Sequence, residues 1–154
     1  MLEVGKKAPA FSLLDDAGVK RSLKNEAGKW VVIYFYPKDS TPGCTKEACA
    51  IRDIYQDFKK LGVTVFGVSK DSAESHAKFK TKFELPFTLL SDESTAMIER
   101  YGAWKEKSMY GKTFMGIQRI SYLIDPQGKV AKVYPKVNPT EHALEILNDL
   151  RELM

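Results

Sequence analysis

The sequence predicts an α/β fold built on a mostly parallel central sheet, with helices on both faces and an antiparallel edge. Short apolar runs rich in β-branched and aromatic residues alternate with segments of helical periodicity, a pattern typical of such folds. Near the C-terminal end, two apolar runs are separated by Asp125-Pro126-Gln127-Gly128, a turn sequence that indicates an antiparallel hairpin. At about 150 residues per domain, the 154 residues of the chain correspond to one domain, residues 1–154.

The strands are expected where apolar runs are bounded by turn residues. Residues 11–22 alternate weakly around Asp15-Asp16-Ala17-Gly18, which is typical of a β-hairpin at the N-terminal end. Trp30–Tyr36 is continuously apolar and is followed by Pro37, which predicts a strand buried on both faces. The remaining strands are expected at Val63–Val68, Phe87–Leu90, Ile120–Ile124 and Val130–Tyr134.

Helices are expected between these strands and after the last one. From Cys44 to Leu61, apolar residues recur at helical spacing. Asp71-Ser72-Ala73-Glu74 is similar to a capping box and predicts that a helix begins there. A short helix is expected over Thr95–Tyr101, and Asn138-Pro139-Thr140-Glu141 is typical of the start of a final helix.

The segment Gly102–Gly116 has no clear periodicity and yet is rich in large apolar side chains. Loops of this length in compact domains are often functional. Two interpretations stay open: an extended hairpin packed on the surface, or a wall of a functional site or partner-docking patch. The apolar residues are Trp104, Met109, Tyr110, Phe114 and Met115.

Composition and charge argue against several classes of protein. The 24 basic and 20 acidic residues leave a net charge of +4, spread along the chain, which does not favour nucleic-acid binding. The longest apolar run is far shorter than the roughly 20 residues that span a bilayer, so no membrane association is expected. The N-terminal segment lacks the apolar core of a signal peptide and carries Glu3, so a cytoplasmic location is expected.

Other familiar motifs fail on inspection. Gly111-Lys112-Thr113 lacks the glycine that a phosphate-binding loop needs, because Glu106 stands at that position. No dinucleotide-binding fingerprint is present. His76 and His142 are not spaced with the cysteines as zinc ligands are, and we interpret both as ordinary surface or edge histidines.

The informative stretch runs from Pro37 to Cys49. It follows the most buried strand and opens the next helix, and ligands of parallel α/β sheets bind at that end of the strands. Cys44 is expected in the first turn of the helix, where unpaired backbone N–H groups and the helix dipole favour a thiolate over a thiol. A thiolate is the nucleophilic form of cysteine.

Cys49 lies five residues after Cys44, about 140° around the helix. It therefore points away from the apolar stripe and does not read as a core residue. Five residues along an intact helix separate α-carbons by roughly 8–9 Å, whereas a disulfide needs less than about 7 Å. If the two cysteines bond, the first turns of the helix must unwind, with Gly43 and the proline-containing loop before it helping to accommodate the change.

These residues resemble a known family. Pro37-x-x-x-Thr41-x-x-Cys44 matches the active-site motif of the peroxiredoxins, and Cys44-x4-Cys49 resembles the spacing in their bacterioferritin-comigratory-protein subfamily, also called peroxiredoxin Q. The opening segment Val4–Leu13 and the arginine-bearing strand Gly116–Asp125 are also similar to those of that subfamily.

The resemblance implies a thioredoxin-like fold with an N-terminal extension, and a thiol peroxidase that needs no metal, haem or flavin. Cys44 would attack the peroxide, and Cys49 would resolve the resulting sulfenic acid as an intramolecular disulfide. Thr41 would hydrogen-bond the thiolate and the peroxide, and Arg119 would stabilise the thiolate and polarise the peroxide. Pro37 would shield Cys44 from water. Glu47 would either orient Arg119 or favour the helix start.

The implied substrates are hydrogen peroxide and alkyl hydroperoxides, and the implied reductant is thioredoxin or a similar dithiol. Relatives of this kind are often monomers, and a dimer stays open. The main alternative is a thiol–disulfide oxidoreductase without peroxidase activity, a class that usually carries Cys-x-x-Cys, whereas Glu47 stands three residues after Cys44. A binding protein that uses residues 102–116 is the second alternative, and a zinc-binding protein has too few ligands.

Overall fold

The computed structural model describes residues 1–154 and contains nine strands, five α-helices and one short 3-10 helix. The strands are β1 (Ser12–Asp15), β2 (Lys20–Ser22), β3 (Val31–Phe35), β4 (Thr64–Ser69), β5 (Thr88–Ser91), β6 (Trp104–Met109), β7 (Lys112–Ile117), β8 (Ser121–Ile124) and β9 (Val130–Tyr134). The helices are η1 (Lys24–Glu26), α1 (Pro42–Asp53), α2 (Tyr55–Lys60), α3 (Ala73–Phe83), α4 (Ala96–Arg100) and α5 (His142–Leu153).

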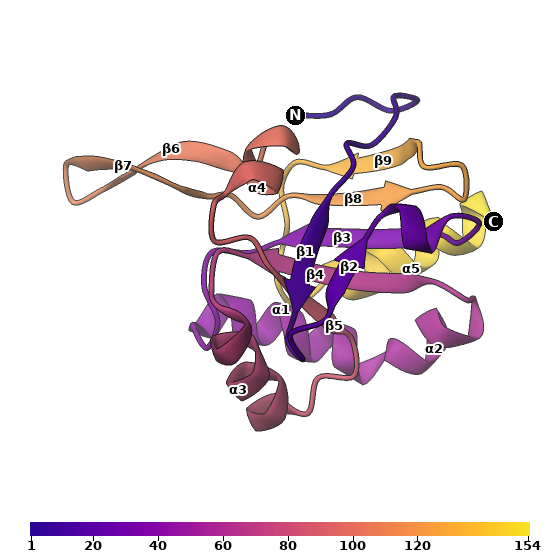
Figure 1. Cartoon of the computed structure of the whole chain (residues 1–154), viewed down its shortest axis with the longest axis horizontal. Coiled ribbons are helices and arrows are strands. Elements are labelled where there is room, and N and C mark those ends of the chain that lie inside the picture. Colours follow the sequence, from indigo (N-terminus) through magenta and orange to yellow (C-terminus); the bar gives the residue numbers. More distant parts are fainter.

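Seven strands form the central sheet in the order β2-β1-β5-β4-β3-β8-β9 (Figure 1). The three middle strands β3, β4 and β5 are parallel. Strands β8 and β9 extend the sheet antiparallel on one side, and the β1–β2 hairpin extends it antiparallel on the other. The predicted mixed α/β architecture, including both hairpins, is confirmed.

The two faces of the sheet carry separate hydrophobic clusters. Strand β3 lies in the middle and is buried along its whole length. Its side chains alternate: Val32 and Tyr34 join the cluster formed with α1, α2, α3 and α5. Val31, Ile33 and Phe35 join the cluster formed with α4 and the N-terminal segment. This two-sided burial explains why the strand reads as an unbroken apolar run.

The long helix expected from Cys44 to Leu61 is divided into two. At Ile54 the backbone leaves the helical region, with φ −118° and ψ 16°, so α1 ends at Asp53 and α2 begins at Tyr55. Ile51 before the break and Phe58 after it pack into the same cluster. Because the apolar face continues across the break, the periodicity gives no sign of it.

Two helix starts also differ from expectation. The cap of α3 is Ser72 rather than Asp71, and its side chain accepts a hydrogen bond from the Ser75 N–H. Helix α5 begins at His142 rather than at Pro139, because Asn138 Oδ1 instead closes a tight turn by accepting from the Thr140 N–H at 3.0 Å. The side chains expected to cap these helices, Asp71 and Asn138, instead accept hydrogen bonds from Ser69 Oγ and from the Thr140 N–H.

The interpretation of both histidines as surface or edge residues was wrong. His76 and His142 are 0% and 1% exposed. The ring of His142 lies 2.8 Å from Ser121 Oγ and 2.9 Å from Glu145 Oε1. Burial lowers the pKa of His142, and Glu145 opposes that shift. Buried imidazoles require such partners. Glu145 lies one turn further along α5, whereas Ser121 comes from β8, which no local pattern connects to His142.

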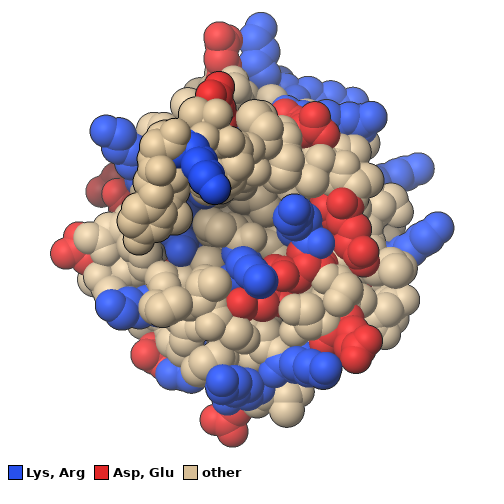
Figure 2. Space-filling view, turned by 90° about the vertical axis from the view of Figure 1, so that its left-hand side faces the viewer, with Lys and Arg blue, Asp and Glu red and all other residues tan.

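The segment 102–116 contains the two strands of an antiparallel hairpin, β6 and β7, which forms a two-stranded sheet of its own. It projects from the body of the molecule rather than packing on the surface (Figure 1). Figure 2 views this end of the molecule, with acidic and basic side chains interspersed around a hollow. At the tip Tyr110 is 97% exposed. None of the helices has both the length and the apolar character of a membrane-spanning segment.

Candidate active site

Cys44 lies where the sequence placed it, in the first turn of α1. The chain leaves β3 at Phe35, passes Pro37, and begins α1 at Pro42 with Thr41 as the cap residue. The Thr45 N–H donates to the Thr41 carbonyl at 2.9 Å, which closes the first turn. The thiol of Cys44 is buried in this turn, with the residue only 1% exposed.

Arg119 reaches Cys44 from the link between β7 and β8. Its Nη2 donates to Cys44 Sγ at 3.2 Å, and its Nη1 donates to Glu47 Oε1 at 3.1 Å. A single guanidinium therefore bridges the thiol and the carboxylate of α1. Since a guanidinium stays protonated at any physiological pH, it supplies a permanent positive charge beside the sulfur.

Gly43 leaves room for this arginine. A Cβ added at Gly43 would lie 2.6 Å from Arg119 Nη2, closer than real contacts allow. The sequence suggested only that Gly43 eases unwinding. The structure adds that its missing side chain lets the guanidinium lie against the first turn of α1.

Glu47 is buried on the inner side of α1. Burial raises its pKa to about 7, although the neighbouring charge and hydrogen bond of Arg119 act in the opposite direction. Its Oε1 accepts from Arg119, while its Oε2 has no hydrogen-bond partner. Of the two roles left open for Glu47, the contact favours holding Arg119.

Lys107 was missed by the sequence reasoning. It lies on β6 opposite Phe114, and its Cδ is 3.2 Å from the position of a Cβ at Gly116, so its chain crosses the hairpin face. Burial is the main cause that lowers its pKa; Arg119 also lowers it, and Cys44 raises it. Lys107 is thus electrostatically coupled to the site, and no local motif marks it.

Thr41 and Pro37 flank the thiol without contacting it by hydrogen bonds. The Thr41 hydroxyl donates to the Lys38 carbonyl at 2.9 Å, and the expected hydrogen bond to Cys44 is not formed. Pro37 is half-buried directly after Tyr36. Both residues belong to the loop that delivers Cys44 to Arg119.

Cys49 is half-buried further along α1, and both cysteines are free. Helix α1 runs without a break from Pro42 to Asp53. The two thiols are therefore held apart by an intact helix, as the spacing predicted.

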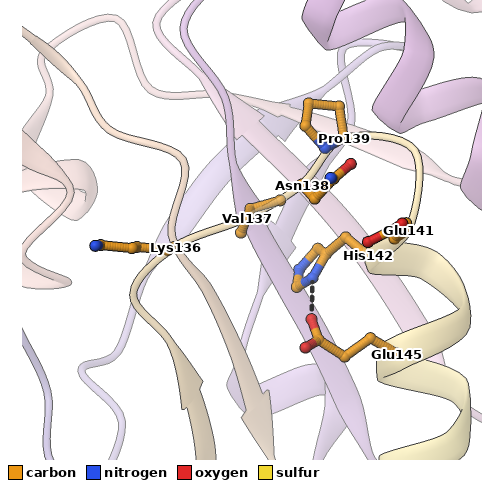
Figure 3. A pocket seen from close by; sticks show the side chains of 7 residues that line it. All are labelled: Lys136, Val137, Asn138, Pro139, Glu141, His142 and Glu145. Carbon is orange, nitrogen blue, oxygen red and sulfur yellow. Dashed lines mark hydrogen bonds and ion pairs between the residues drawn. The ribbon is translucent and has the colours of Figure 1, made fainter.

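Two other features lie outside this site. A cavity of about 610 Å³ is found where the chain enters α5 (Figure 3). Neither Cys44 nor Arg119 is among its lining residues, which are Lys136, Val137, Asn138, Pro139, Glu141, His142 and Glu145. Asp39, Asp71 and His76 bring potential metal-binding atoms within 4.8 Å of one another. Those atoms already make hydrogen bonds within the protein.

Residues 4–133 match the AhpC/TSA family, and the chain belongs to it. It is 49% identical to the putative peroxiredoxin bcp of Coxiella burnetii, over 97% of this chain and 99% of the relative. It is 46% identical to peroxiredoxin Bcp of Escherichia coli K12, over 98% and 97%. The solved Xanthomonas campestris bacterioferritin comigratory protein superposes with a TM-score of 0.92 at 38% identity, over 98% and 99%.

The family and the fold together define what the chain does. The sheet and its helices are the thioredoxin-like fold of peroxiredoxins, with the β1–β2 hairpin as the N-terminal extension. The chain is a thiol-dependent peroxidase that takes peroxides as substrates and is reduced by a thioredoxin-type dithiol. The resemblance inferred from the sequence is therefore confirmed.

Proposed function

We propose that Cys44 is the cysteine that attacks the peroxide and that Cys49 resolves the product. The observation that carries this proposal is the position of Arg119, whose Nη2 lies 3.2 Å from the sulfur of Cys44. Arg52, which follows Cys49 along α1, gives its guanidinium hydrogen bonds to Asp53 and to the Phe83 carbonyl instead. A fixed positive charge beside one of two thiols favours that thiol as the nucleophile.

The reaction has three steps. The Cys44 thiolate attacks one peroxide oxygen, the O–O bond breaks, and the leaving alkoxide or hydroxide takes up a proton. Cys44 is thereby oxidised to a sulfenic acid, and the peroxide is reduced to an alcohol or water. The Cys49 thiol then displaces the sulfenic hydroxyl as water and forms a disulfide. A dithiol reductant finally restores both thiols and is itself oxidised to a disulfide.

The surrounding residues support the first step. Arg119 stabilises the negative charge on the thiolate and on the departing oxygen. Glu47 orients Arg119, and Gly43 gives it space. Thr41, whose hydroxyl hydrogen is donated to the Lys38 carbonyl, offers its oxygen as an acceptor to the incoming peroxide, and Pro37 limits access of water to the sulfur.

We further propose hydrogen peroxide and alkyl hydroperoxides as the substrates and thioredoxin as the reductant. Structures of the Xanthomonas campestris relative concern its alkyl peroxide reduction activity, which supports the alkyl class. Two free cysteines on one helix suit an intramolecular disulfide, so one chain is sufficient for the cycle, and we propose a monomer. Catalytic thiols of this kind work in reducing compartments, which favours the cytoplasm.

Intact mass after one equivalent of hydrogen peroxide tests the assignment. The reduced protein should lose about 2 Da as both thiols form the disulfide. The Cys49→Ser variant should gain about 16 or 32 Da and fail to turn over with thioredoxin. Cys44→Ser should consume no peroxide. Unchanged mass in the wild-type protein, or normal turnover by Cys49→Ser, would contradict the proposed roles.

A further inference from the structure

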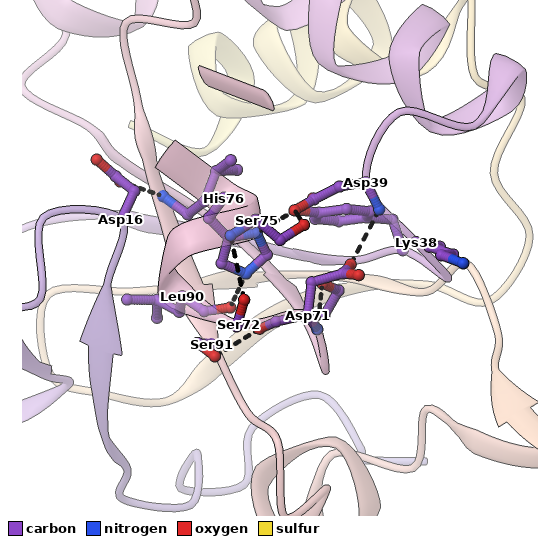
Figure 4. Close-up of polar contacts among 12 residues, drawn as sticks. Asp16, Lys38, Asp39, Asp71, Ser72, Ser75, His76, Leu90 and Ser91 are labelled. Atoms are coloured by element: carbon purple, nitrogen blue, oxygen red, sulfur yellow. Dashed lines mark hydrogen bonds and ion pairs between the residues drawn. The ribbon is translucent and has the colours of Figure 1, made fainter. Parts of the chain in front are cut away.

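A buried polar network lies beneath the loop that leads to Cys44 (Figure 4). Its centre is Asp39, which is only 6% exposed although it belongs to the connection between β3 and α1. Asp39 Oδ1 accepts from the Tyr36 hydroxyl at 2.6 Å, and Asp39 Oδ2 accepts from Ser75 Oγ at 2.8 Å. The same Oδ2 lies 2.7 Å from Nδ1 of His76.

His76 and Asp39 form a hydrogen-bonded pair, and the other hydrogen-bond partner of the His76 ring determines how many protons the pair holds. Nε2 of His76 lies 2.9 Å from the Leu90 carbonyl, which can only accept, so Nε2 carries a hydrogen. Nδ1 faces a carboxylate oxygen, so a further proton must lie between Nδ1 and Asp39 Oδ2. The pair is therefore an imidazolium with a carboxylate, or an imidazole with a carboxylic acid. Both forms carry no net charge, which suits a site with no access to water.

The backbone of Asp39 is held as well. Its N–H donates to Asp71 Oδ2 at 2.9 Å, and the same oxygen accepts from Ser69 Oγ at 2.6 Å. The loop is thus fastened to the connection between β4 and α3. Tyr36, Asp71 and Ser75 are the other polar groups that face the Asp39–His76 pair.

The residue after Asp39 carries backbone strain. Ser40 has a φ of 63°, in the left-handed region that a serine rarely adopts. Such a conformation is energetically unfavourable and persists only where the surroundings impose it. Here the surroundings are the fastened Asp39 on one side and Thr41, which caps α1, on the other.

We propose that His76 is a positioning residue that, through Asp39, holds the loop 37–41 and the first turn of α1 in the form where Cys44 meets Arg119. The inference rests on the proposed roles of Cys44 and Cys49. Disulfide formation requires that same turn to unwind, because an intact helix keeps the two thiols apart. A weakened His76–Asp39 clamp should therefore slow the reaction with peroxide and at the same time speed the formation of the disulfide.

The test uses matched tyrosine variants. Tyr36→Phe removes only a hydroxyl, which donates to Asp39 at 2.6 Å and lies 3.3 Å from His76 Nδ1. Tyr101→Phe removes the hydroxyl of another fully buried tyrosine, which donates to the Pro9 carbonyl at 2.6 Å on the other face of the sheet. Both changes delete one hydroxyl donor from a buried tyrosine. A difference between the two variants in reaction rates therefore reports on the His76–Asp39 clamp rather than on a general loss of stability. His76→Gln, checked for native circular dichroism, tests the central residue.

Quenched-flow mass spectrometry with hydrogen peroxide separates the sulfenic acid from the disulfide. In Tyr36→Phe we expect sulfenic acid formation to become roughly tenfold slower, because the variant loses about one hydrogen bond that holds the reactive form. Disulfide formation should become faster. His76→Gln should show a larger shift in the same directions, and Tyr101→Phe should leave both rates within twofold of the wild type.

Two results would overturn the clamp. One is that both rates in Tyr36→Phe and His76→Gln equal those of the wild type; the other is that both rates fall together, as for simple destabilisation. In either case the wild-type protein still forms the sulfenic acid and then the disulfide. If the wild type forms neither, the proposed function itself fails, so the two failures are distinguishable.

Discussion

Arg119 hydrogen-bonds two acidic groups of α1, the thiol of Cys44 and the carboxyl group of Glu47. It donates to a sulfur that reacts as an anion and to a carboxylate that burial discourages from ionising. Lys107 adds a second cation coupled to Cys44. Residues of the β6–β7 hairpin and of the strand link that follows it are thus placed to stabilise the Cys44 thiolate of the proposed mechanism.

Glu47 should make stability depend on pH. Its pKa rises from 4.5 to about 7 on folding, chiefly through burial. Between these values the folded protein retains a proton that the unfolded chain releases. The stabilisation is therefore complete below 4.5 and is lost as the pH rises through about 7. The slope approaches about 1.4 kcal/mol per pH unit.

Urea unfolding of the wild type and of Glu47→Gln across this pH range measures the effect. The amide cannot titrate, so the free energy of unfolding of the variant should fall less steeply with rising pH. Contributions from all other groups are common to both proteins and cancel in the comparison. Parallel pH profiles would show that Glu47 does not titrate as its burial implies.

Gly43→Ala should separate activity from stability. Alanine favours the helix by up to about 1 kcal/mol relative to glycine, so the variant should be folded and at least nearly as stable. The new methyl group would lie 2.6 Å from Arg119 Nη2 and force the guanidinium to move. We expect the rate of peroxide reduction to fall about 10- to 100-fold, whereas Thr45→Ala in the same turn should keep it. Full activity of Gly43→Ala would mean that Arg119 can move without cost.

At the scale of secondary-structure elements, α1 and α2 are separate units. The first turn of α1 follows the loop 37–41, and Cys44, Ala48 and Ile51 along the helix all pack in one core cluster. The break at Ile54 separates α1 from α2. Unwinding of the first turns therefore removes Cys44 and Ala48 from that cluster but need not extend into α2.

Amide hydrogen exchange should register this unwinding. In the reduced protein the amides of residues 45–50 should be protected, because α1 is continuous over them. In the disulfide form they should exchange much faster, while the amides of α2 and α5 stay as protected as before. Equal protection of residues 45–50 in the two redox forms would show that the disulfide forms without melting the helix.

At the scale of the whole molecule, the hairpin and the body are unequally stabilised. The body contains two clusters of buried side chains, one on each face of the sheet. The hairpin contributes its base to one of them, through Ile117, whereas the tip side chains Met109, Tyr110 and Phe114 are exposed. The tip thus adds little to the burial that stabilises the fold.

Replacing residues 108–113 by a short turn tests this division while keeping Lys107. The free energy of unfolding should change by less than about 1 kcal/mol, since exposed residues contribute little. Phe66→Ala, at a residue that is 0% exposed, should instead cost about 3–5 kcal/mol. A large loss of stability in the shortened hairpin would show that the tip is packed against the body in solution.

Much of the fold follows from local pattern. A strand buried on both faces must be apolar at every position, and a half-buried helix must be apolar at every third or fourth position. For this reason β3 and α1 can be predicted from the sequence. The same holds for Cys44, because the residues after a buried parallel strand meet the start of the next helix at the ligand-binding edge. The break at Ile54 left no such trace, since the apolar face continues across it. The late start of α5 left none either, because Asn138 is as well suited to a turn as to a helix cap.

The sequence by itself determined the strands of the central sheet, most of the helices, the position of Cys44 and the separation of Cys49 from it, whereas it left the hairpin over 102–116 as one of two interpretations. Only the tertiary structure decided which distant groups meet. Arg119 contacts Cys44 across 75 residues, and His76 contacts Asp39 across 37. Periodicity and capping are set by neighbours along the chain, whereas a buried charge or imidazole is stabilised by partners that packing brings from elsewhere. For that reason the histidines looked exposed in the sequence and proved buried in the fold.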